Sequence, residues 1–262
     1  MRLRKYIDLY RAGFKKASHY RLQTAASLVS SILYIVMLYA VWTAIASSGT
    51  LEGGLTKVLS YIIVAQVVQR FVGTALESYF GDKIRKGTIV NQMKRPISVR
   101  AQAYLHQAGW QSFELLTRAF PILILGLAFT QLRLPGPVYL LSFSASVLMS
   151  FHLMFAVAFC TSMLTFWTKT ANGIRFTRSN IIRLFSGALF PLYLLPDGVK
   201  QLFYILPFHL IIDGPINLFL METAGGDILT LLAQQLVWTG VFLLLGELLW
   251  RKAKKKLTVQ GG

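Results

Sequence analysis

Acidic residues and cysteine are scarce in this chain. Of its 262 residues only 10 are Asp or Glu, against 27 Lys or Arg, and Cys160 is the single cysteine. One cysteine permits neither an intrachain disulfide nor a metal site built from several cysteines. Charged residues make up only 14% of the chain, whereas soluble domains have about 25%. Together with a hydrophobic share of 55%, this composition excludes an ordinary soluble domain.

Enzyme motifs are missing as well. The chain has neither His-Glu-x-x-His nor Gly-x-Ser-x-Gly, which mark metalloproteases and serine hydrolases. Gly81 and Gly87 flank a lysine-containing segment, but five residues separate them instead of the four of a P-loop, and Thr88 follows directly without the required lysine. We therefore expect no ATPase site, catalytic residue, cofactor or metal within this chain.

Long apolar runs fill most of the sequence. A helix needs about 20 mostly apolar residues to cross roughly 30 Å of hydrocarbon, and helices satisfy their own backbone groups in lipid, which lone strands do not. Six runs qualify, at 25–46, 57–76, 110–131, 138–166, 180–196 and 228–250. The sequence predicts an all-α polytopic membrane protein with six transmembrane helices in a single domain, 1–262.

The basic residues are grouped along the chain. They gather before residue 24 and within 77–100, 169–183 and 251–256. In a six-span layout all four groups lie on one side, as the positive-inside rule requires of cytoplasmic segments. We expect a multi-pass protein of the cell membrane with both termini in the cytoplasm. The net charge of +17 would suggest nucleic acid in a soluble protein, but this one-sided distribution argues against such a partner.

Two segments outside the spans have predictable forms. Within 1–23, apolar residues recur every three or four positions among lysines and arginines, which predicts an amphipathic helix on the inner membrane surface. A basic tail that only fixes topology is the alternative. Segment 197–226 is apolar but broken by Pro207, Gly214 and Pro215. Its pieces are too short to span, so we expect short outer helices, partly re-entrant, before the last span.

Polar residues recur on one face of the second and third spans, and polar faces in a membrane should contact protein or water. The fourth span adds one histidine. These residues form a candidate translocation path or polar layer: Gln66, Gln69, Arg70, Glu114, Arg118 and His152. The two arginines could equally snorkel to the interface or form a structural ion-pair layer, and the histidine could be a hydrogen-bonded interior residue.

The apolar face of segment 77–100 changes direction at a glycine. Leu76, Phe80 and Ile84 share one side of a helix, whereas the apolar residues after Gly87 cluster roughly opposite. Such a change at glycine indicates that one helix ends and another begins, and Pro96 should end the second. We predict a short transverse helix whose apolar side chains fit a groove on a soluble protein. The alternative is a membrane-surface helix held by anionic headgroups.

This pattern resembles the permease subunit of ABC-2-type exporters. The resemblance extends over essentially the whole chain and rests on Ile84-Arg85-Lys86-Gly87-Thr88-Ile89, Met93-Lys94-Arg95-Pro96-Ile97, Ser186-Gly187 with Phe190-Pro191, and Leu206-Pro207-Phe208. It implies that 77–100 is the segment that couples the permease to an ATPase. The implied coupling residues are Ile84, Arg85, Gly87, Ile89, Val90, Met93, Arg95 and Pro96.

The resemblance also implies partners. Two permeases, identical or paralogous, would form the path in the lipid bilayer, and two cytoplasmic ABC ATPase subunits would bind and hydrolyse ATP with Mg. The substrate would be amphipathic, such as a drug, antibiotic, lipid or peptide. An ion-driven secondary transporter is the alternative, but such proteins show inverted repeats and mid-membrane charges, which we do not find in the sequence.

Overall fold

The structure, a computed structural model, describes residues 2–47, 49, 54–129, 132–168 and 170–257. Within these residues all regular structure is helical. The α-helices are α1 (Arg2–Ser18), α2 (Arg21–Ser47), α3 (Gly54–Val72), α4 (Leu76–Arg85), α5 (Ile89–Met93), α6 (Val99–Glu114), α7 (Phe120–Phe129), α8 (Pro137–Met163), α9 (Thr165–Thr168), α10 (Ala171–Phe185), α11 (Asp197–Ile205), α12 (Asp213–Phe219) and α13 (Gly225–Leu257). A π-helical turn, Leu115–Ala119, joins α6 to α7, and 3-10 turns cover Leu192–Leu194 and Pro207–Ile211.

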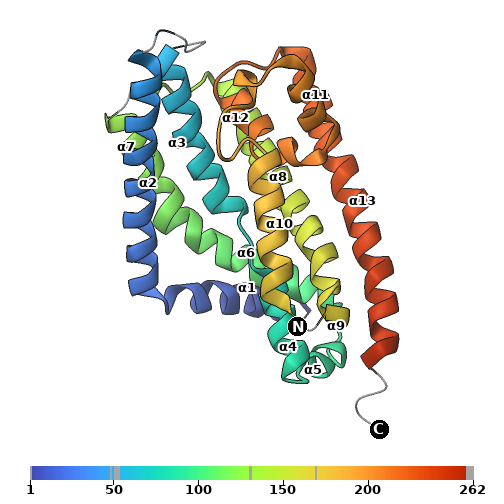
Figure 1. Cartoon of the computed structure of the whole chain (residues 1–262). Coiled ribbons are helices and arrows are strands. Elements are labelled where there is room, and N and C mark those ends of the chain that lie inside the picture. Colours follow the sequence, from blue (N-terminus) through green and yellow to red (C-terminus); the bar gives the residue numbers. More distant parts are fainter. Residues whose placement is uncertain (1, 48, 50–53, 130–131, 169, 258–262) are drawn as a thin grey trace.

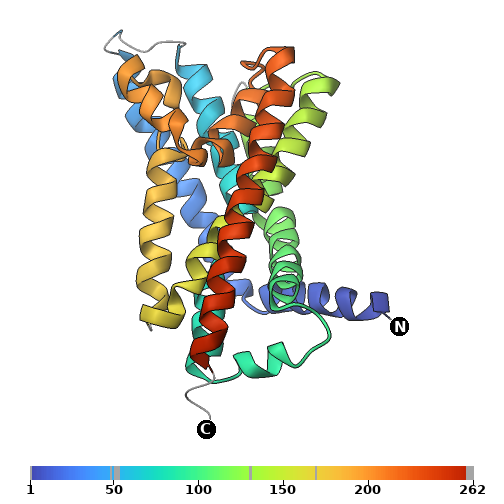
Figure 2. The same cartoon turned by 90° about the vertical axis from the view of Figure 1, so that its right-hand side faces the viewer.

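The long helices run side by side, and the short ones gather at the two ends of the bundle (Figures 1 and 2). One end carries α1, α4 and α5 together with the lysine-rich end of α13, and we call it the basic end. The other carries α11 and α12, and we call it the α11 end. The α1 helix lies at right angles to the long helices in both views. The two segments predicted to lie outside the spans therefore sit at opposite ends.

Five helical stretches within the described residues are long and apolar enough to cross a membrane: 22–47, 54–85, 99–128, 137–168 and 225–256. They correspond to predicted spans one to four and six. The third begins at Val99, earlier than the predicted 110, because its first turns carry glutamines that lower the apolar content of the sequence there.

The predicted span 180–196 does not form a continuous helix, so its predicted helix bounds were wrong. The helix in this region, α10, covers Ala171–Phe185 and therefore starts among the basic residues that the sequence assigned to a loop. It ends because Gly187 adopts a φ of 81°, a left-handed conformation that terminates an α-helix. Pro191, which lacks a backbone N–H, prevents the helix from resuming before the short 3-10 turn.

A buried aspartate fixes this break to the α11 end. Asp213 accepts hydrogen bonds from the hydroxyls of Tyr61 (2.8 Å) and Tyr204 (3.0 Å) and from the amide of Asn217 (2.9 Å). The Tyr61 hydroxyl also lies 3.1 Å from the carbonyl oxygen of Gly187. Because these partners come from α3, α11 and α12, the network connects the end of α10 to the short helices around it.

The core is formed mainly by α3 and α8, which lie inside the bundle. Val64 and Val68 of α3 pack in one cluster with Phe151 and Leu153 of α8. Around them, α2 exposes many large apolar side chains along its length. In a membrane such a surface contacts lipid or another transmembrane protein. The arrangement leaves α2 at the edge of the bundle, as Figure 1 shows.

The amphipathic helix α1 packs closely across α6. A Cβ atom added at Gly13 would overlap the carbonyl oxygen of His106, and one added at Gly109 would overlap that of Tyr10. Phe14 meets Phe113 edge to face, with 5.5 Å between ring centroids. The sequence predicted an amphipathic helix along the inner membrane surface, without a contact between its apolar face and α6. The structure instead uses part of that face to hold α6.

Candidate functional site

The segment between α4 and α5 has the predicted break. Gly87 has a φ of 68°, in the left-handed region that glycine tolerates best, and it separates the end of α4 at Arg85 from the start of α5 at Ile89. Figure 2 shows α5 lying across the bundle axis at the basic end. The predicted short transverse helix is therefore present, and it ends at Met93, two residues before the stop expected from Pro96.

The predicted residues of this segment divide into an anchor and an exposed set. Ile89 is completely buried and packs with Leu76 and Phe80 of α4. Val90 and Met93 remain 43% and 39% exposed. Among the others Ile84 is half-buried, and the residues exposed to solvent are Arg85, Gly87, Arg95 and Pro96. The segment thus presents two apolar side chains on a basic surface, away from its own core.

Two glutamines that the sequence did not single out hold α5 in place. The Gln92 amide donates a hydrogen bond of 2.7 Å to the hydroxyl of Tyr79 in α4. The Gln102 amide, from α6, donates to the carbonyl oxygens of Gln92 (2.9 Å) and Ile97 (2.8 Å). Both glutamines are buried. Because these bonds attach α5 to two helices of the bundle, a displacement of α5 would be transmitted to them.

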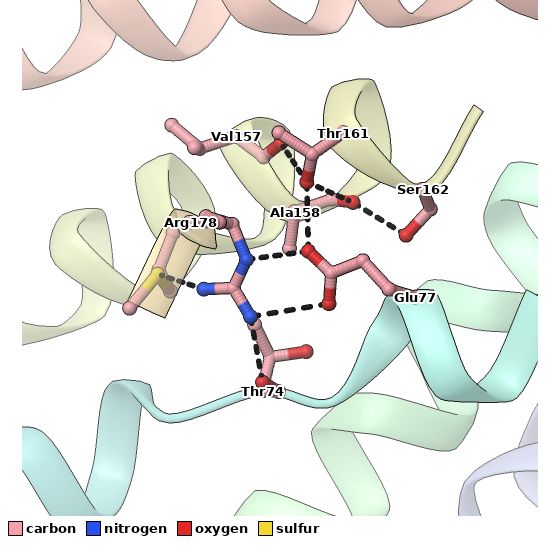
Figure 3. A network of polar contacts seen from close by, with 8 residues as sticks. Thr74, Glu77, Val157, Ala158, Thr161, Ser162 and Arg178 are labelled. Carbon is pink, nitrogen blue, oxygen red and sulfur yellow. Dashed lines mark hydrogen bonds and ion pairs between the residues drawn. The ribbon is translucent and has the colours of Figure 1, made fainter. Parts of the chain in front are cut away.

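A buried ion pair connects α4 to the interior (Figure 3). Glu77, in the first turn of α4, is paired with Arg178 of α10 through both carboxylate oxygens, one of them 3.1 Å from Nη2. Their side chains are 0% and 5% exposed. The Thr161 hydroxyl donates to the same carboxylate at 2.7 Å, and Arg178 Nη2 donates to the carbonyl oxygen of Thr74 at 2.9 Å. The pair therefore joins α4, α8 and α10 to the non-helical link between α3 and α4.

Sequence reasoning missed this pair. In the sequence Glu77 begins the segment 77–100 and Arg178 belongs to the basic group 169–183, and nothing in either segment pairs the two. The available signal was an acidic residue beside an apolar run, because ionisable groups within a membrane segment are rare and usually have a partner. The identity of the partner, 101 residues further along the chain, was not readable from local spacing.

The polar faces of α3 and α6 meet around a cavity of about 630 Å³ at the basic end. We call it the polar cavity. Its lining includes four of the predicted path residues, Gln69, Arg70, Glu114 and Arg118. The fifth, Gln66, lines an adjoining hollow of about 370 Å³ beside α2, and Gln69 and Arg70 border both spaces. The structure therefore brings these five residues together from separate helices.

The charged residues of the polar cavity are only partly paired. Glu114 and Arg118 form an ion pair of 2.7 Å one turn apart. Arg70 donates to the hydroxyl of Ser31 in α2 at 2.5 Å. The amides of Gln107 and Gln111 both donate to the carbonyl oxygen of Gly73, where the backbone between α3 and α4 is not helical. These hydrogen bonds satisfy the carbonyl oxygen of Gly73, which has no helical partner because the span is broken there.

His152 lies apart from this group. Its Nδ1 is 2.6 Å from the carbonyl oxygen of Leu148, so Nδ1 carries the proton. Its Nε2 then accepts from the hydroxyl of Tyr104 at 2.9 Å. With both ring nitrogens occupied, this histidine matches the hydrogen-bonded interior alternative, and the polar cavity does not include it. Within the described residues no group of three or more His, Cys, Asp or Glu could hold a metal ion.

Comparison with known proteins gives one family. A family model described as ABC-2 family transporter protein matches residues 28–261. The match leaves out the first 27 residues and the last one, and so includes all five candidate membrane-spanning stretches except the first few residues of the first. None of the curated proteins matches the chain.

Proposed function

Because the chain belongs to the ABC-2 family of transporter proteins, whose permeases are transmembrane components without an ATPase domain of their own, we propose that it is the permease subunit of an ATP-driven exporter. Separate cytoplasmic ABC ATPase subunits would bind ATP and Mg and hydrolyse the ATP. The family match and the missing P-loop favour this function over an ion-driven secondary transporter.

The α4–α5 segment carries this proposal. It exposes Val90 and Met93 while Ile89 and Gln92 anchor it to the bundle. An exposed apolar pair on a rigid support is suited to insertion into a groove of another protein. ATP binding would close the ATPase pair and move α5, and the movement would pass through α4 to Glu77 and α10. Coupling is thus a shift between two states of the bundle.

A second permease, identical or paralogous, would complete the path beside α10. This helix lies at the surface of the bundle in Figure 2, and Arg175, Asn180 and Arg183 are all exposed on it. Charged and amide groups at this depth would be costly against hydrocarbon. A water-lined interface with another permease accommodates them. An amphipathic drug, antibiotic, lipid or peptide would move along this interface.

A reconstituted complex tests the function. The full chain is co-expressed with an ABC ATPase encoded next to it and purified through a tag on the permease. We expect the purified complex to contain equal numbers of permease and ATPase chains. We also expect it to hydrolyse ATP, which the permease alone should not do. Transport by proteoliposomes should stop when the ATPase lysine that binds phosphate is replaced. Transport that persists with the inactive ATPase, driven by an ion gradient, would contradict the proposal.

The orientation follows from charge. The basic end would face the cytoplasm and the α11 end the outside, in accordance with the positive-inside rule. Position 52 falls between the first two predicted spans and is therefore expected on the outer side, but it is not among the described residues. The exposed residues Asp197 and Lys86 serve as reporters instead.

Cysteine labelling of intact cells checks this orientation in a Cys160→Ala background. An impermeant maleimide should label Asp197→Cys directly, and it should label Lys86→Cys only after the cells are permeabilised. Labelling of Lys86→Cys alone in intact cells would reverse the proposed topology.

A further inference from the structure

The polar cavity has more positive than negative charge. Its cationic lining residues are Lys16 of α1, Arg70 of α3, Arg118 of the π-helical turn and Arg175 of α10. Two carboxylates, Asp82 and Glu114, also line it. The only histidine of the lining is His106. The charges therefore come from helices that are far apart in sequence but converge on one space.

The two carboxylates already have partners. Asp82 lies 2.9 Å from Arg85, which does not line the cavity, and Glu114 lies 2.7 Å from Arg118. In the described part of the chain no carboxylate lies within 4.0 Å of the Arg70 guanidinium, whose side-chain hydrogen bond goes to the hydroxyl of Ser31. Glu114 acts on Arg70 electrostatically from a greater distance, but its carboxylate is already paired with Arg118. Since partly buried charges normally have a counter-charge, Arg70 leaves room for an anion.

Further unpaired donors point to the same space. Within the described residues Lys16 and Arg175 have no ion-pair partner, although both border the cavity. An anion with several oxygens would accept from such groups simultaneously, and arginine suits phosphate in particular because its donors are arranged as a planar fork.

The position of the cavity indicates where such an anion would come from. Lys16 lies in the last turn of α1, the amphipathic helix that runs across the bundle, and Tyr20 follows just after this helix ends. Trp110 lies beside Tyr20 with ring centroids 6.4 Å apart. Amphipathic helices and Tyr–Trp pairs are typical of the headgroup level of a bilayer. Next to the cavity, α2 exposes Val29 and Leu33, which can contact acyl chains.

We propose that the polar cavity binds the phosphate headgroup of a membrane amphiphile, with Arg70 as its main ligand and Lys16 and Arg175 at the entrance. The proposal deepens the permease function and rests on it for the role of the bound lipid as substrate. The headgroup would enter at the level of α1, while its apolar chains stay in the bilayer beside α2. The transported molecules would then be anionic amphiphiles rather than cationic ones.

Lipid retention by the full chain tests the proposal. The purified chain in phosphatidylcholine nanodiscs is titrated with dioleoyl phosphatidic acid, with dioleoylglycerol, which has the same chains without phosphate, and with inorganic phosphate. Native mass spectrometry counts the bound molecules. We expect phosphatidic acid to bind at least about tenfold more tightly than dioleoylglycerol. Arg70→Gln should weaken the binding of phosphatidic acid about tenfold and so abolish this preference. Arg70→Lys should keep most of the binding because it keeps the charge.

Two further variants separate the site from general surface charge. Lys16→Gln changes an exposed residue of the cavity entrance and should lower the affinity for phosphatidic acid about threefold without affecting folding. Arg251→Gln removes the same charge from an exposed position outside the cavity and should change binding less than twofold. Equal losses in Arg70→Gln and Arg251→Gln, or no preference over dioleoylglycerol, would overturn the proposal.

Competition with inorganic phosphate shows whether the cavity binds the phosphate of a lipid headgroup or a free phosphate ion. If it competes as strongly as phosphatidic acid, the site takes a soluble anion and the lipid assignment is wrong. Weak competition supports a headgroup held in place by its chains. Lipid retention needs no ATPase, so a failure here leaves complex assembly and ATP-dependent transport unaffected, and a failure of those leaves lipid binding measurable.

Discussion

Replacing Glu77 by alanine is expected to lower the free energy of unfolding by about 3–5 kcal/mol, because it leaves a buried arginine without its counter-charge. The side chain of Arg178 is 5% exposed, and Glu77 is its carboxylate partner. The loss is measured by denaturant unfolding in mixed lipid–detergent micelles. Since the pair joins α4 to α10, the same variant should also uncouple the basic end from the interior.

Glu247 provides the matched control. Its side chain is 31% exposed, and its carboxylate lies 3.8 Å from both Arg100 and Arg251. Glu247→Ala should cost less than about 1 kcal/mol, as for other exposed ion pairs. The double variant Glu77→Ala with Arg178→Met should recover part of the loss, because neither buried charge remains. Similar losses for Glu77→Ala and Glu247→Ala would show that the buried pair is not a structural link.

The α4–α5 segment could be predicted almost completely from the sequence. Its signals are local: an apolar face that changes direction, a glycine with positive φ at the change, and a proline that limits the second helix. Such features act within a few residues, so the sequence contains them directly. The amphipathic helix α1 was predictable for the same reason, although its packing across α6 depends on Gly13 and Gly109, which only the three-dimensional structure pairs.

The α10 helix could not be predicted as it is. Membrane helices are predicted from long uncharged runs, whereas α10 contains three arginines. One of these arginines holds α10 in the bundle through an ion pair. Arg178 is tolerated inside the bundle because Glu77 neutralises it, and that contact spans 101 residues of sequence. The end of the helix at Gly187 likewise depends on Tyr61 and Asp213, from distant elements. Tertiary pairing of this kind has no local signature.

For the candidate path, the sequence predicted the polar face of each helix but not the cavity that these faces form together. Periodicity placed Gln69 and Arg70 on one face of α3, and Glu114 and Arg118 close together on α6 and the turn that follows it. It did not indicate that the two faces meet, nor that Arg70 would contact Ser31 of α2. His152 shows the reverse case, since it was predicted to belong to the path but bonds to Leu148 of its own helix and to Tyr104 of α6.

Replacing Val90 and Met93 together by aspartate is expected to prevent productive docking of the ATPase. Both side chains are exposed, so the permease itself should fold normally. In the docked state each aspartate would place an unpaired carboxylate in an apolar contact, at a cost of about 2 kcal/mol or more. Such a cost corresponds to a roughly thirtyfold loss of affinity. The amount of ATPase that co-purifies and its stimulated hydrolysis should both fall.

The most direct measurement compares two single variants with the same substitution at equally exposed valines. Val90 in α5 is 43% exposed and Val199 in α11, at the opposite end, is 45% exposed. ATP hydrolysis and bound ATPase are measured for purified complexes of Val90→Asp and Val199→Asp, with thermal stability of the permease as a check on folding. We predict that the Val90→Asp complex loses most of its ATP hydrolysis and most of its bound ATPase, whereas the Val199→Asp complex keeps both at the level of the unchanged protein. Equal values for the two complexes would contradict coupling through α5.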